Sequence, residues 1–107
     1  MLVVSEEAFT DSSAKTGIAF YTTAAGSTSV SERMRLDGAG HLGIGTSTPN
    51  AYAILDLTST TAALILPRMT TTQRDAMTAV SGMLIYNTTT GKLNVRGASA
   101  WEVVTSA

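Results

Sequence analysis

The stretch ERMRLDGAGHLGIG, residues 32–45, decides the fold that the sequence predicts. Its first five residues alternate, with the two arginines on one side and Met34 and Leu36 on the other, which is the period of a half-buried strand. DGAG is a turn sequence, because aspartate tolerates left-handed backbone and glycine adopts positive φ without strain. After the turn, Leu42 and Ile44 again share one side. The stretch therefore predicts a β-hairpin, Glu32–Leu36 against His41–Gly45.

The hairpin also contains a literal G-x-G-x-x-G, at Gly38, Gly40 and Gly43. A dinucleotide-binding fingerprint requires a buried strand before these glycines and a helix after them. Here the preceding strand is half-exposed, and the following IGTSTP cannot open a helix, so the sequence predicts no nucleotide site. Instead, Gly38 and Gly40 shape the turn. We expect Gly43 and Gly45 to leave room for another backbone, as in chains wound about one axis.

Outside the hairpin, the apolar and β-branched runs are short and bounded by turn residues. One helix is predicted over about residues 71–80, because Thr70 stands three residues before Gln73, the spacing of a capping box. No β-α-β alternation appears, so we predict a mainly β fold of short antiparallel strands in two modules, residues 1–50 and 51–107. The further strands are expected at Leu2–Val4, Gly17–Thr23, Ala53–Leu57, Ala63–Met69, Met83–Asn87, Leu93–Gly97 and Ala100–Val104.

The composition favours an obligate oligomer. Charged residues make up 14% of the 107 residues and aromatic residues 6%, while serine and threonine exceed a quarter. Few large side chains remain for a core within one chain, and partner chains would supply the missing apolar area. The net charge of −1 without a basic patch argues against nucleic-acid binding. The sequence lacks cysteine, a basic n-region at its start and any apolar run near 20 residues, so we expect no disulfide, no cleaved signal and no membrane insertion.

No combination of residues predicts catalysis. Ser47, His41 and Asp56 can be written as a triad, but nothing in the sequence indicates that they meet. His41 is the single histidine, so a metal site is not expected, and the acidic residues are scattered. We therefore expect no enzyme, no catalytic residue, no metal and no cofactor. Trp101 lies in an alternating strand, where packing between chains is favoured over a role as an exposed receptor anchor.

Two segments resemble a known family. SERMRLDGAGHLGIGTSTPNAYAILDL resembles the recurring ERMRI..dGnvGIGT.sPna.LdV segment of bacteriophage tail fibre proteins. AALILPRMTTTQRDAMTAVSGMLIYNTTTGKLNVRGASAWEVV resembles the segment that often follows it, a pattern also found in repetitive bacterial surface proteins. Together they span roughly Gly17 to Val104. The resemblance implies an elongated, intertwined, β-rich homotrimer: a fibre or spike of the virion, assembled in the host cytoplasm, that binds other virion proteins and contributes to host-cell attachment.

Two alternatives stay open: a receptor- or glycan-binding head, and a shaft segment of a bacterial surface adhesin. The host-contact candidate is Trp101, and the contact would be with a host cell-surface receptor or glycan. For the fibre, the apolar residues expected at the trimer interface are Met34, Leu36, Leu42, Ile44, Ile54, Leu64 and Leu66.

Overall fold

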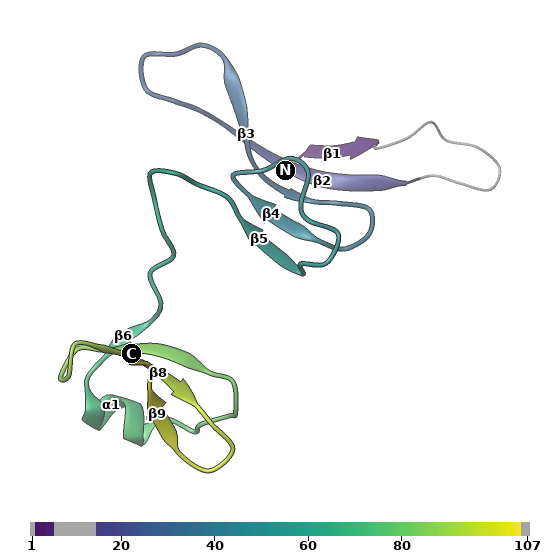
Figure 1. The fold of residues 1–107 in the computed structure, drawn as a ribbon. Helices are drawn as coiled ribbons and strands as arrows, with labels where there is room; N and C mark the ends of the chain where they lie inside the picture. Colours follow the sequence, from purple (N-terminus) through teal and green to yellow (C-terminus); the bar gives the residue numbers. More distant parts are fainter. Residues whose placement is uncertain (1, 6–14, 106–107) are drawn as a thin grey trace. The chain divides into compact units, whose positions relative to one another are not determined.

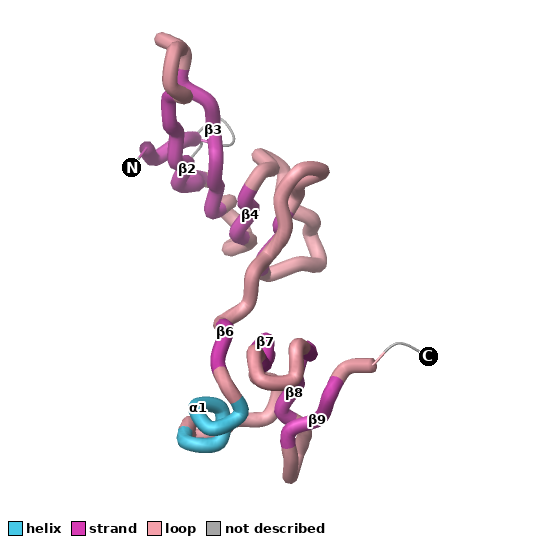
Figure 2. Tube along the Cα trace, turned by 90° about the vertical axis from the view of Figure 1, so that its left-hand side faces the viewer, coloured by secondary structure: helices cyan, strands magenta, loops and turns pink. Residues whose placement is uncertain are grey.

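The computed structural model describes residues 2–5 and 15–105 and divides the chain into two units, Met1–Ala63 and Leu64–Ala107 (Figure 1). Each unit contains one β-sheet, and strands and loops dominate, as the sequence predicts (Figure 2). The division falls after the boundary expected at residue 50, because β5 (Leu55–Leu57) joins the first sheet.

The first sheet has the strand order β1-β2-β3-β4-β5. The predicted hairpin is present as β3 (Val30–Leu36) antiparallel to β4 (Leu42–Ile44). Its turn is closed by Asp37, whose carboxylate accepts hydrogen bonds from the backbone N–H of Ala39 at 3.0 Å and of His41 at 2.9 Å. The remaining strands are β1 (Leu2–Ser5), which covers the expected N-terminal strand, and β2 (Thr16–Thr23).

The mainly β fold is confirmed, and most of its neighbouring strands are antiparallel as predicted, but two pairs are parallel. β5 runs parallel to β4, and in the second sheet β6 (Arg68–Met69) runs parallel to β7 (Leu84–Asn87). Parallel neighbours need a crossover connection rather than a tight turn. The chain supplies one in residues 45–54 and the other in a segment that includes the helix.

The glycines of the hairpin approach backbone closely, but the neighbour is the same chain. A Cβ on Gly43 would lie 2.8 Å from Pro49 Cγ, and one on Gly45 would lie 2.1 Å from the carbonyl oxygen of Thr58. Gly45 also has a φ of +81°. The crossover residues explain Gly43, and Thr58, directly after β5, explains Gly45, so the expected crowding by another chain is not needed.

The second sheet has the order β6-β7-β8-β9, with β8 at Lys92–Arg96 and β9 at Trp101–Val103. Helix α1 spans Thr71–Ala76 and starts with the predicted capping box: the Thr70 side chain accepts from Gln73 N–H, and the Gln73 side chain accepts from Thr70 N–H. The helix ends well before residue 80, where we expected it to end. Met77 is already extended, and no residue of α1 is buried, so no packing holds further turns in place.

The strand expected at Ala63–Met69 is also wrong in extent. Only Arg68 and Met69 pair with a neighbour, and the residues before them are outside any sheet. A strand exists only where a partner supplies hydrogen bonds, which apolar and β-branched composition alone cannot guarantee.

One copy of the chain contains almost no core. Among the described residues, the buried hydrophobic side chains are Ala19 and Ile85, at 0% and 2% exposure.

Candidate trimer interface

One face of the first sheet carries two rows of large apolar side chains. Residues paired across a sheet share a face, as do residues two apart along a strand. The register joins Ile18, Leu36, Leu42 and Leu55 into one row across β2 to β5, and a second row runs beside it. The second row consists of Phe20, Met34, Ile44 and Leu57. Eight large apolar side chains thus form a single surface, here called the first apolar face.

No described element of the first unit covers this face. Each of its eight side chains is at least partly exposed, and five of them expose 37% to 47% of their surface. Burying what remains of those five would contribute about 3–6 kcal/mol per chain, at 1.5–3 kcal/mol for a complete side chain. A monomer has no physical reason to place its largest apolar side chains in water.

The opposite face of the same sheet is the covered one; its buried residues are small, and Arg35 also lies on it. Gly17, Ala19 and Gly43 are its buried members, and the crossover residues lie against Gly43. Asp56 also points to this side, where its carboxylate accepts from Asn50 N–H at 2.9 Å. The chain therefore fills its own packing with backbone, glycine and alanine and leaves its large apolar groups for a partner.

The second sheet repeats this division between its two faces. Side chains of α1 reach one face, where Ile85, Asn87 and Asn94 are buried. The other face carries Leu84, Tyr86, Leu93 and Val95, none of them buried, with Arg68 and Glu102 at its margins. This second apolar face is open in the single chain.

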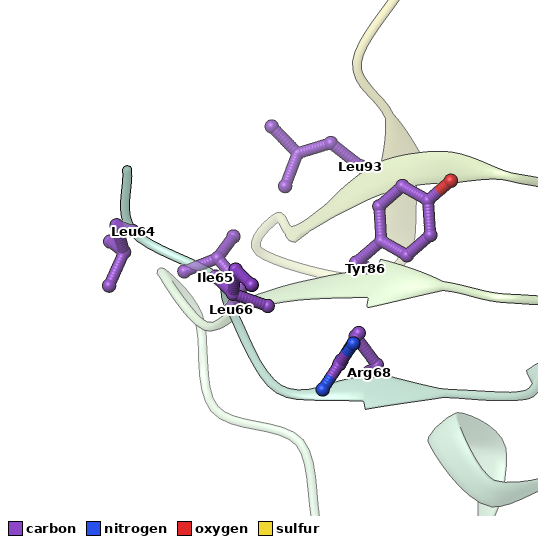
Figure 3. A pocket seen from close by; sticks show the side chains of 6 residues that line it. All are labelled: Leu64, Ile65, Leu66, Arg68, Tyr86 and Leu93. Carbon is purple, nitrogen blue, oxygen red and sulfur yellow. The ribbon is translucent and has the colours of Figure 1, made fainter. Parts of the chain in front are cut away.

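A groove lies on the second apolar face beside the segment that enters β6. Its volume is about 480 Å³, and Figure 3 shows the side chains that line it. Tyr86 and Leu93 come from paired positions of β7 and β8, and Leu64 and Ile65 come from the entering segment. The complete lining is Leu64, Ile65, Leu66, Arg68, Tyr86 and Leu93. One guanidinium among apolar groups makes the groove suited to aliphatic side chains.

A family model described as phage tail like trimerisation region matches residues 43–106. The match covers more than half of the chain, from the middle of β4 to beyond β9. The chain belongs to this family. It is accordingly a phage tail-like structural protein with a region for self-association as a trimer, and the resemblance to fibre proteins is confirmed at that level. No curated protein and no solved structure matches the chain.

The phage tail-like trimerisation region contains the whole second apolar face but only part of the first. Ile44, Leu55 and Leu57 lie inside the match, whereas Ile18 and Phe20 lie before it. The first apolar face is continuous across that limit, because β3 joins the strands on either side. The surface open to partners therefore extends beyond the matched residues.

The structure brings four of the seven predicted interface residues together. Met34, Leu36, Leu42 and Ile44 are neighbours on the first apolar face. Ile54 precedes β5 and is 78% exposed. Leu64 and Leu66 belong to the second unit, where they line the groove, and the role of all seven in a trimer stays a prediction.

Trp101 lies on the covered face of the second sheet, whereas Tyr86 lies on the other face. It is partly buried, and the Arg74 guanidinium stands 5.7 Å from its ring centroid. Arg74 also forms an ion pair with Asp75 at 2.8 Å. These contacts give Trp101 a packing role within its own chain, and its role as a host contact stays a prediction.

Sequence reasoning missed a buried amide pair beneath α1. Asn87 and Asn94 are each 1% exposed, and Asn87 Nδ2 donates to Asn94 Oδ1 at 3.1 Å and to Thr71 Oγ1 at 2.9 Å. Arg74 donates to the same Asn94 oxygen at 2.9 Å. Asn87 Oδ1 also accepts from Thr89 N–H at 2.9 Å. The turn sequence NTTTG was the available signal, since asparagine often hydrogen-bonds the backbone two residues on.

Two members of the hypothetical triad, His41 and Asp56, make contacts with residues outside it. The imidazole of His41 lies 3.2 Å from Asp37, and Asp56 is engaged by Asn50. The backbone N–H of His41, and then its ring, hold the pKa of Asp37 below its usual value. Within residues 2–5 and 15–105, no group of three or more acidic or histidine side chains is placed to hold a metal ion. Over the same ranges, no helix has the length and apolar character of a membrane span.

Proposed function

We propose that this chain is a structural component of a phage virion fibre or spike, a homotrimer that extends from the particle and contributes to host-cell attachment. The observation that carries the proposal is the first apolar face, two rows of four large apolar side chains that no described element of their own unit covers. The family match supports the same partner, because the region it covers is one of trimerisation.

In this proposal, a second and a third copy of the chain cover the first apolar face. In a ring of three, each subunit presents one surface to the next, so each exposed apolar area is buried at a subunit boundary or at the axis. Assembly also removes apolar surface from water at about 25 cal/mol per Å². A trimer of this kind gives stiffness along a fibre without requiring a large core in any one chain.

The proposal assigns no catalytic activity and no cofactor to the chain. Two residues of the hypothetical triad, His41 and Asp56, instead contact Asp37 and Asn50. Virion location and host attachment rest on the likeness to fibre proteins.

Immunogold electron microscopy of particles tests the location. An antibody raised against the purified chain should label tail fibres or spikes, and its Fab fragment should reduce adsorption of particles to host cells. Gold confined to capsids, or to debris without particles, would overturn the fibre assignment. Labelled fibres with unchanged adsorption would remove host attachment and keep the structural role.

A further inference from the structure

The segment Ala63–Leu66 has exposed apolar side chains and backbone groups without hydrogen-bond partners among the described residues. Leu64 and Ile65 are 64% and 69% exposed, although they lie next to a sheet whose face is apolar. The backbone of the four residues makes no hydrogen bond to any residue that the structure describes. Pairing starts directly afterwards, where Tyr86 N–H donates to Pro67 O at 2.9 Å. The segment thus leads into β6 with backbone groups that no described residue pairs.

Such a segment is a template for another chain. Extended backbone with free N–H and C=O groups pairs readily with a second strand, and apolar side chains strengthen that tendency. The sequence ALIL has the composition of a strand, which is why the sequence predicted one over Ala63–Met69. The composition fits a strand whose partner is supplied by assembly.

We propose that Ala63–Leu66 is an inter-chain contact, in which the segments of the three copies pack together and a neighbour's apolar side chain fills the groove beside Tyr86 and Leu93. The inference rests on the proposed trimer and adds where the chains meet. The segment lies inside the matched trimerisation region, so the contact is continuous with the part of the chain already assigned to self-association.

The charge pattern favours copies of this chain over a different partner. No residue from Thr58 to Pro67 is charged, so three copies can approach one axis without repulsion between like charges. The groove carries a single charge, that of Arg68 at its margin. Leu64 and Ile65 line the groove themselves, so their exposed aliphatic groups and the groove form one apolar surface that a neighbouring copy can cover.

The test uses the absence of cysteine from the chain. Ile65→Cys introduces one thiol at the proposed contact, and Val80→Cys introduces one at a position of similar exposure, 59%, in the loop between α1 and β7. Disulfide formation requires Cα atoms within about 7 Å. Under mild oxidation of the trimer, we expect Ile65→Cys to form covalent dimers at least tenfold faster than Val80→Cys.

A second variant separates folding from contact. Ile65→Ser should raise the dissociation rate of the trimer at least tenfold while the circular dichroism of the protein stays that of wild type. Equal cross-linking of the two cysteine variants in a protein that sediments as a trimer would overturn the contact and leave the trimer intact. A monomeric wild-type protein would instead overturn the proposed trimer, and the contact with it.

Discussion

Replacement of Ile44 by serine tests the first apolar face. Ile44 keeps 43% of its surface exposed in one chain, so its burial between chains contributes about 0.6–1.3 kcal/mol. Three copies give about 2–4 kcal/mol per trimer, which corresponds to a roughly 30- to 1,000-fold weaker association constant. Because three chains dissociate together, the midpoint concentration rises as the square root of that factor, roughly 5- to 30-fold.

The assay is analytical ultracentrifugation over a dilution series, with circular dichroism to confirm that the variant is folded. Val80→Ser is the matched control, since Val80 is 59% exposed and lies outside both apolar faces. We expect its midpoint to stay within about twofold of wild type, well below the shift of Ile44→Ser. If the two variants shift the midpoint equally, the first apolar face is not the surface that joins the chains.

Three further substitutions test local features by urea unfolding at fixed protein concentration. Gly45→Ala should lower the free energy of unfolding more than Gly26→Ala, for which we expect a loss of about 1–2 kcal/mol. Both glycines have a φ of +81°, but only at Gly45 would a Cβ meet backbone. Equal losses would contradict the close approach at Gly45. The folded pKa of Asp37 lies below its unfolded value of about 3.9, mainly because its carboxylate accepts from the His41 N–H. The carboxylate therefore stabilises the fold above the unfolded pKa. This contribution is lost as the pH falls through the folded pKa. Asp37→Asn should therefore be less stable than wild type at pH 7, with a difference that shrinks below about pH 4, and a constant difference would refute the assignment. Thr70→Val removes the helix cap and should cost about 1 kcal/mol, whereas an unchanged midpoint would show that the capping box contributes nothing.

Features specified by neighbouring residues could be predicted from the sequence. The hairpin at residues 32–45 follows from alternation and a glycine turn, and the capping box follows from the spacing of Thr70 and Gln73. The shared face of Met34, Leu36, Leu42 and Ile44 follows from the period of two along each strand.

Features that depend on distant parts of the chain could not be predicted. Pairing of β5 with β4 requires a crossover through residues 45–54, and neither strand's own sequence indicates that the two run parallel. For the same reason Leu55 and Leu57 were not recognised as members of the first apolar face. The strand predicted at Ala63–Met69 rests on its apolar composition, but within the described chain only Arg68 and Met69 pair with a neighbouring strand.

The mass of the purified chain in native buffer tests the central claim most directly. Sedimentation equilibrium at micromolar concentration should report three chains of 11.1 kDa, about 33 kDa, since the two apolar faces have no cover in one copy. A folded species of 11.1 kDa that persists at that concentration would contradict the account.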